Sequence, residues 1–271
     1  MIKTAATSSL DPVVQVINPE GLHEVVLVCE HASAYIPPNF NDLGLDKQTA
    51  TSHIAWDPGA LETAKAMSKH LNAVLVAGCV SRLVYDCNRP PEAPSAMPDV
   101  SEIYTVPGNQ GLSDQARRAR AETYYRPFEQ ALKETLSNHE KPPVVVTVHS
   151  FTPTFLRQKR DVEIGILHDE DARLADAVLS IASGYDVRRN QPYGPEDGVT
   201  HTLRRHALRK NLLNVMIEVR NDLIASPDAC SRMAKTLSLW VEQALTTLRA
   251  LPEKGGAHDS SARLYRLGRY L

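Results

Sequence analysis

The stretch PPVVVTVHS (residues 142–150) predicts the centre of the fold. Its β-branched, almost wholly apolar run Val144–Val148 is bounded by two prolines on one side and by His149 and Ser150 on the other. Such a run is typical of a strand that is buried on both faces of a parallel or mixed sheet. The polar residues that follow it would lie at the carboxyl end of this strand, where open α/β sheets bind their ligands.

Strand and helix patterns alternate on both sides of this run. The other predicted strands are Glu24–Glu30, Ala73–Ala77, Leu83–Cys87, Glu163–Leu167 and Asn214–Val219. The predicted helices run from Asp57 to about Leu71, over most of Gly111–Asn138, and over Asp171–Ser183 and Ser226–Leu251. This order predicts an α/β fold, a three-layer α/β/α sandwich around a mixed, mostly parallel sheet of the phosphorylase/hydrolase-like kind. Because no Gly-rich linker or repeat interrupts it, we expect a single domain over residues 1–271, with a polar tail at 252–271.

Composition and charge exclude several classes of protein. The 271 residues include 30 Lys and Arg against 32 Asp and Glu, so the net charge is −2 and no basic excess is available to neutralise phosphates. No apolar run approaches the ~20 residues of a membrane-spanning helix, and the first residues lack the apolar segment of a signal peptide. The four cysteines form no CxxC pair. We therefore expect a soluble, cytoplasmic protein that binds neither nucleic acid nor membrane.

Four predicted strands are flanked by polar residues that can do chemistry. These residues are Glu30 and His31, Arg82 with Asn88 and Arg89, His149 and Ser150, and Glu218 with Arg220, Asn221 and Asp222. Since the carboxyl ends of parallel strands meet at one edge of a sheet, we expect a single site.

His31 and His149 together are typical of the imidazole part of a catalytic zinc site, which has about three protein ligands and one open position. Either histidine alone is more often a hydrogen-bonded loop residue. Asp57 is a candidate third ligand four residues after His53, although the cap of the following helix is an equally good interpretation of it. His and carboxylate ligands also suit iron or manganese. Ser150 lacks a GxSxG elbow, so a serine hydrolase is disfavoured.

The arginines and a later histidine are candidates for substrate binding. Arg82, Arg89 and Arg220 can each bind a carboxylate or a developing oxyanion, or can pair internally with Asp86, Asp222 or Glu218. His201 lies in the segment GVTHTLRRHA, which could form a wall of the substrate site. Its cationic residues could equally form a solvated helix face.

Six motifs in order resemble the N-formylglutamate amidohydrolase family. They are CEHAS at 29–33, HIAWDPGA at 53–60, SRLVYDCNR at 81–89, HSF at 149–151, NQPYG at 190–194 and IEVRNDL at 217–223. The resemblance runs from about Val25 to Leu245. It implies a fold similar to that of the zinc carboxypeptidases and aspartoacylases, and a zinc-dependent hydrolase that removes the N-formyl group from glutamate during histidine degradation.

The resemblance also implies roles for individual residues. His31 and His149 would bind Zn²⁺, or another divalent metal, and Glu218 would be the general base. Arg82 would stabilise the oxyanion, and Asn88 and Arg89 would hold a substrate carboxylate, with Arg220 and His201 further candidates for binding the acidic N-acyl amino acid.

Two departures from the family pattern leave questions open. The ligand pair H-x-x-E is absent because Ala34 stands three residues after His31, so we prefer Asp57 to Glu30 or His53 as the third ligand. The first motif is Glu-His-Ala-Ser rather than Pro-His-Ser-Gly-like, which leaves open a different N-acyl amino acid or peptide as substrate. A binder of acidic small molecules without catalysis is the remaining alternative.

Overall fold

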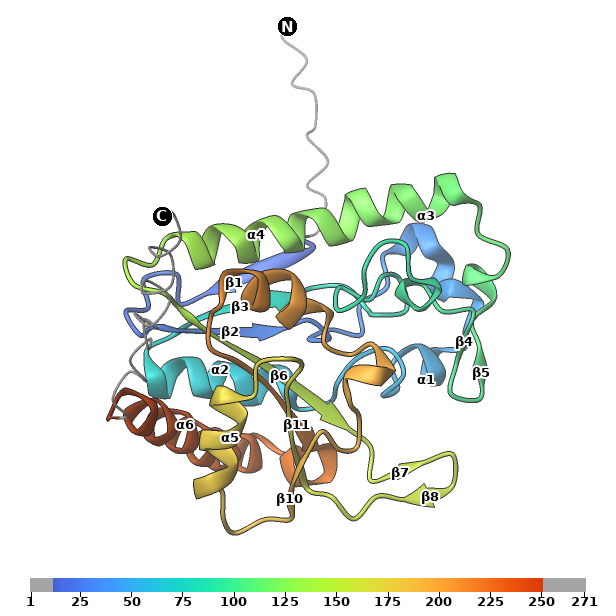
Figure 1. The fold of residues 1–271 in the computed structure, drawn as a ribbon. Coiled ribbons are helices and arrows are strands. Elements are labelled where there is room, and N and C mark those ends of the chain that lie inside the picture. Colours follow the sequence, from blue (N-terminus) through green and yellow to red (C-terminus); the bar gives the residue numbers. More distant parts are fainter. Residues whose placement is uncertain (1–11, 251–271) are drawn as a thin grey trace, which may run out of the picture.

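A computed structural model describes residues 12–250, and a seven-stranded sheet lies at its centre (Figure 1). Across the sheet the strands are β1 (Val14–Ile17), β3 (Val74–Gly78), β2 (Val25–Cys29), β6 (Val144–Phe151), β11 (Asn214–Arg220), β9 (Ile164–Leu167) and β10 (Val187–Arg189). The four strands β3, β2, β6 and β11 are parallel. β1 runs antiparallel at one edge, whereas β9 and β10 run antiparallel to the central strands at the other. The sheet is therefore mixed and mostly parallel, as predicted.

Helices cover both faces of the sheet. On one face lie α2 (Ala60–Leu71), α5 (Arg173–Ile181) and α6 (Pro227–Ala250), which share one large apolar core with the sheet. On the other face α3 (Asp114–Arg120) continues through a π-helical turn at Ala121–Tyr125 into α4 (Arg126–Ser137), which packs on β1 and β3. The three-layer prediction is confirmed. None of the helices within residues 12–250 is both long enough and apolar enough to span a bilayer. The predicted tail at 252–271 lies outside the described residues.

The remaining elements are short. They are α1 (Lys47–Ala50), the hairpins β4 (Val100–Ser101) with β5 (Tyr104–Thr105) and β7 (Thr154–Phe155) with β8 (Gln158–Lys159), a π-helical turn at Leu203–Ala207, and 3₁₀ turns at Pro38–Gly44, Pro94–Ala96, Pro107–Asn109, Pro195–Asp197, Leu208–Lys210 and Asn221–Ile224.

Alternation of side chains along the central strands decides which residues can form a site. In β6 the side chains of Val146 and Val148 belong to the core beneath α2 and α6, so His149 points to the opposite face. The same alternation in β11 places Val219 in that core and Glu218 on the face of His149. Since Glu218 and His149 are paired in the parallel register, their side chains lie side by side near the carboxyl ends of both strands.

One predicted strand is wrong. Residues 83–87 form turns rather than a strand, although Leu83, Val84 and Tyr85 are buried in a second apolar cluster. The amide of Val84 donates to the carbonyl of Ser81, and no neighbouring strand pairs with this segment among residues 12–250. Burial in a turn produces the same apolar, β-branched pattern as a strand, which explains the error.

Candidate functional site

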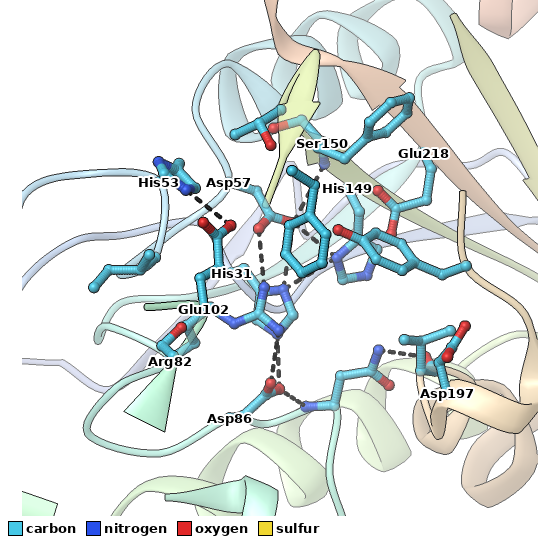
Figure 2. A pocket seen from close by; sticks show the side chains of 18 of the residues that line it. His31, His53, Asp57, Arg82, Asp86, Glu102, His149, Ser150, Asp197 and Glu218 are labelled. Carbon is cyan, nitrogen blue, oxygen red and sulfur yellow. Dashed lines mark hydrogen bonds and ion pairs between the residues drawn. The ribbon is translucent and has the colours of Figure 1, made fainter. Parts of the chain in front are cut away.

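A cavity of about 690 Å³ opens above the carboxyl ends of the central strands. His31, Asp57, Arg82, His149 and Glu218 all line it, so the structure brings together the predicted metal ligands, base and oxyanion residue. Figure 2 shows the two imidazoles and the Asp57 carboxylate pointing toward one another, with Glu218 beside His149.

Three buried side chains converge on one point of this cavity. His31 lies two residues after β2, His149 lies in β6, and Asp57 precedes α2; each is at most 3% exposed. The Oδ2 atom of Asp57 lies 3.3 Å from His31 Nδ1 and 2.9 Å from His149 Nδ1, and the two Nδ1 atoms are 3.2 Å apart. These three residues form a group that could hold a metal ion.

The arrangement of protons favours a cation at this point. His31 Nε2 lies 2.7 Å from the carboxylate of Asp86, and His149 Nε2 lies 3.1 Å from that of Glu30. Carboxylates in these places favour a proton on each Nε2 and so leave both Nδ1 lone pairs directed at the Asp57 carboxylate. Three lone pairs this close repel one another unless a cation lies between them. A tetrahedral Zn²⁺ with bonds of 2.0–2.1 Å separates its ligands by about 3.3 Å, so the donor set fits the ion.

The cluster attracts positive charge: the pKa of Asp57 is lowered and that of His149 is raised. Burial alone would raise the pKa of Asp57, but His31 and His149 outweigh it and hold the pKa far below its usual range. Burial alone would lower the pKa of His149, but Glu30 and Asp57 outweigh it and raise the pKa well above its ordinary value. The Asp57 carboxylate is thus ionised, as a metal ligand must be.

Asp86 connects the ligands to the wall of the cavity. Its carboxylate accepts hydrogen bonds from Arg82 Nη2 at 2.9 Å and from the backbone amide of Asn88 at 2.9 Å, besides its contact with His31. Arg82 also donates through Nη1 to Asp57 Oδ1 at 3.3 Å. The predicted internal pairing of Arg82 with Asp86 is therefore present, and the other donors of its five N–H groups remain for a ligand in the cavity.

Glu218 has the environment of a proton acceptor. It is 5% exposed, and its Oε2 atom has no hydrogen-bond partner among the described residues. Burial, helped by the nearby Asp57 carboxylate and opposed by His149, raises the pKa of Glu218 to about 7. A carboxylate whose pKa is close to neutral pH can both take up and release a proton during a reaction.

The alternative third ligands, His53 and Glu30, lie away from the point where the three side chains meet. His53 pairs with Glu102 at 3.0 Å, away from the two other histidines (Figure 2). Glu30 contacts His149 on its Nε2 side, opposite the Nδ1 atom that faces Asp57. The carboxylate of Asp57 thus takes part in the cluster and does not cap α2.

Ser150 contributes to the position of Asp57. Its amide donates to Asp57 Oδ2 at 3.3 Å and its hydroxyl donates to the Pro58 carbonyl at 2.8 Å. The hydroxyl is occupied by this backbone contact and faces away from its neighbour His149.

The side chain of Asn88 is fully engaged with the backbone of a distant loop. Its Nδ2 atom donates to the carbonyl of Val199 at 2.5 Å, and its Oδ1 atom accepts from the amide of Thr202 at 3.0 Å. Asn88 lines the cavity, but these bonds join two walls of it.

The two other predicted arginines differ in position. Arg89 lines the cavity and donates through Nη1 to the carbonyl of Asn88. Arg220 does not belong to the lining; it pairs with Asp222 at 2.8 Å and donates to the carbonyl of Asp161 at 2.9 Å. Arg89 is thus the better placed of the two to meet a substrate.

His201 also lies outside the cavity lining. Its Nε2 atom is 2.8 Å from the hydroxyl of Tyr125 in the π-helical turn before α4. The cationic residues after it include Arg204 and Arg205, which are exposed and pair with the buried carboxylate of Asp169 and the mostly buried carboxylate of Glu129. That segment therefore includes the solvated helical face considered from the sequence.

Arg160 and Tyr193 are among the cavity residues that had no role in the sequence prediction. Arg160 follows the β7–β8 hairpin, and Tyr193 lies in the NQPYG motif after β10. The hydroxyl of Tyr193 accepts a hydrogen bond from Arg160 Nη2 at 3.0 Å. Arg160 belongs to the polar run RQKRD, a pattern typical of an exposed loop. The aromatic residues Phe151 and Phe155 shortly before it were the sequence signal for a position in the cavity.

Comparisons with known proteins identify the family of the chain and its fold. The model of the N-formylglutamate amidohydrolase family matches residues 23–225. A crystal structure of a gene product of Agrobacterium tumefaciens is 52% identical, with a TM-score of 0.86 over 88% of this chain and 96% of that one. The structure of N-formylglutamate amidohydrolase from Ralstonia eutropha JMP134 is 17% identical with a TM-score of 0.55, over 88% and 98% of the two chains, and shares the fold. A search of curated proteins found no match. Because the family model covers most of the chain, this protein belongs to the N-formylglutamate amidohydrolase family.

Proposed function

We propose that this protein is a metal-dependent amidohydrolase that cleaves the N-formyl, or another N-acyl, amide of an acidic amino acid. N-formyl-L-glutamate is the first candidate, with glutamate and formate as products. The observation that carries the proposal is the convergence of His31, Asp57 and His149 on one point beside Glu218, within a cavity that also contains arginines.

Zn²⁺ is the ion that we propose, since two imidazoles and one carboxylate can hold it with an open coordination position, although the same donors also suit iron or manganese. A bound Zn²⁺ would supply a Lewis acid for the amide carbonyl and would lower the pKa of a bound water to about 7. Asp86 and Glu30 would keep the two imidazoles in the tautomer that the ion requires.

Protein side chains would then move the protons. Glu218 takes one proton from the water molecule while the water oxygen attacks the formyl carbon. Glu218 then passes this proton to the amide nitrogen as the C–N bond breaks. The N–H groups of Arg82 that Asp57 and Asp86 leave free stabilise the negative charge on the former carbonyl oxygen. Since a formyl group offers little surface, recognition falls on the amino-acid part, where Arg89 binds a carboxylate.

Membership of the family supports the formyl substrate, and the arginines of the cavity support an acidic one. A cytoplasmic location, a place in histidine degradation and a closer relation to the zinc carboxypeptidases and aspartoacylases remain predictions from the sequence.

Metal content tests the proposal directly. Purified protein, measured by plasma mass spectrometry after incubation with zinc, is expected to hold about one Zn²⁺ per chain. His149→Ala removes one ligand and should lose the ion, whereas the matched variant His53→Ala, whose imidazole pairs with Glu102, should keep it. A native protein without metal would contradict the proposal and favour a binding protein without catalysis.

Substrate comparison distinguishes the remaining alternatives. Hydrolysis of N-formyl-L-glutamate is expected to be faster than that of N-acetyl-L-aspartate or a short peptide. A reversed order would assign the same site to another N-acyl amino acid or to a peptide.

A further inference from the structure

We infer that Arg160 is a second substrate-binding arginine, which holds one of the two carboxylates of a dicarboxylic amino-acid substrate and sets the preference for acidic over neutral substrates. This inference rests on the proposed function and concerns the same cavity.

The position of Arg160 is fixed by aromatic rings. Its guanidinium carbon lies 4.5 Å from the ring centroid of Phe155, 4.9 Å from that of Tyr193 and 5.6 Å from that of Phe151. Its Nη2 atom donates to the hydroxyl of Tyr193, while a longer bond of 3.4 Å joins Nη1 to the carbonyl of Thr152. A planar guanidinium held in this way keeps its orientation, so little conformational entropy is lost when it binds a carboxylate.

Phe151 places this cation near the reaction centre. It is the last residue of β6, two positions after His149, and it lines the same cavity. Tyr193, which contacts Arg160, lines this cavity together with Glu218 and Arg82. A ligand in the cavity can therefore meet both Arg160 and the reaction centre.

The charge of Arg160 is not balanced by a neighbouring carboxylate. Among residues 12–250 no Asp or Glu oxygen lies within 4.0 Å of its guanidinium, whereas Arg82 in the same cavity is paired with both Asp57 and Asp86. Aromatic faces attract the cation, but its acceptors are one hydroxyl and one carbonyl, both uncharged. A half-buried guanidinium in this state is complementary to an anionic ligand, and a carboxylate matches its paired N–H groups.

Arg89 and Arg160 together match two carboxylates. Both line the cavity without a carboxylate partner among the described residues, and they come from different segments, the loop after β3 and the residues that follow the β7–β8 hairpin. A substrate such as an N-acyl glutamate carries two negative charges, so each arginine would bind one of them. This explains why the cavity has unpaired cations in addition to the paired Arg82.

The test compares an acidic with a neutral substrate. In the zinc-loaded enzyme, Arg160→Met keeps an unbranched apolar chain against the rings but removes the charge. We expect kcat/KM for N-formyl-L-glutamate to fall about 10- to 100-fold, mainly through KM, because one charged hydrogen-bonded contact is lost. The value for N-formyl-L-glutamine should change by less than about threefold, and Arg160→Lys should restore part of the preference. The matched control is Arg157→Met, an exposed arginine in the turn of the same hairpin that does not line the cavity.

An equal loss for both substrates, or no loss for either, would overturn the inference. Calorimetric titration with glutarate, a dicarboxylate without an amide, separates this outcome from failure of the proposed function. If the native protein hydrolyses neither substrate but binds glutarate, and Arg160→Met does not, the proposed function is wrong, whereas the assignment of Arg160 to a carboxylate of the ligand holds. If neither protein binds glutarate and the preference is absent, the inference is wrong.

Discussion

In the proposed reaction Glu218 transfers a proton from the water to the amide nitrogen, and its surroundings suit this role. Its carboxylate lies beside His149 on the next strand, and one of its oxygens has no hydrogen-bond partner within residues 12–250. Glu218→Gln keeps the size and the hydrogen-bonding capacity but cannot accept the proton. We expect kcat to fall about 10²- to 10⁴-fold while the metal stays bound. Turnover close to that of the native enzyme, measured on the same batch as its metal content, would rule out Glu218 as the base.

The pH dependence of kcat/KM in the native enzyme and in Glu218→Gln gives a second test of this role. A base acts in its ionised form, so kcat/KM should fall about tenfold per pH unit once the pH drops below the pKa of Glu218. Burial raises that pKa to about 7, and a bound cation lowers it, so the midpoint is expected at or below about pH 7. The residual activity of Glu218→Gln should lack this acidic limb.

Single residues also show how far the sequence predicts the site. His31, His149, Asp57 and Glu218 could be found because they lie in or close to the ends of recognisable strands and helices, where an α/β sheet gathers its ligands. Arg160 could not, since its position depends on contacts with rings from β6, β7 and the loop after β10. No spacing in a linear sequence records such contacts.

At the scale of elements, strand β9 leaves room for the loop that carries Tyr193. Gly165 in β9 is paired with Glu218 in β11, and a Cβ atom added at Gly165 would collide with the carbonyl oxygen of Gln191. The loop thus lies directly across the face of the strand and can approach only because the side chain is absent.

Gly165→Ala should therefore displace this loop. We expect it to lower the free energy of unfolding by about 1–3 kcal/mol, measured by urea denaturation, and to weaken binding of acidic substrates as Tyr193 moves away from Arg160. Gly111→Ala serves as the contrast: its Cβ meets nothing within 4 Å, and only its positive φ of 63° makes Ala unfavourable. It should cost about 1–2 kcal/mol and leave substrate preference unchanged. Unchanged preference in Gly165→Ala would show that the loop tolerates the shift.

Elements were predictable where burial and periodicity agree. The central strands β2, β6 and β11 are buried along nearly their whole length, and their sequences are correspondingly apolar. The edge strands β1 and β10 are short and partly exposed, so nothing in their sequences separates them from loops. The same ambiguity made the buried turn at 83–87 resemble a strand.

At the scale of the whole molecule, the candidate metal centre joins three distant parts of the chain. Its ligands come from the end of β2, the start of α2 and the end of β6, so an ion bound there cross-links the two halves of the parallel sheet. Binding of this kind stabilises the folded state alone, because the unfolded chain does not hold the ligands together.

Removal of the metal should consequently lower the melting temperature. With the free ion at about 100 times its Kd, binding adds about 2.7 kcal/mol to the free energy of unfolding. This corresponds to a rise in melting temperature of about 5–10 °C for a domain of this size. Calorimetric scans with and without a chelator measure this shift. In His149→Ala the chelator should change the melting temperature by less than about 1 °C; a full shift in that variant would place the stabilising ion elsewhere.

The reversed direction of β9 has a consequence for how such a protein can change its substrate. The chain leaves β6 and enters β9 at the same edge of the sheet, since Phe151 is level with Arg220 and Ile164 with Val219. Residues 152–163, which include Arg160, therefore need not cross the sheet, and their length and composition can vary without altering the register of any central strand. The ligands of the candidate metal centre lie outside this segment, in β6, just after β2 and just before α2. Evolution or engineering can thus replace residues 152–163 as a whole, and with them the substrate preference, while the metal ligands and Glu218 keep their positions.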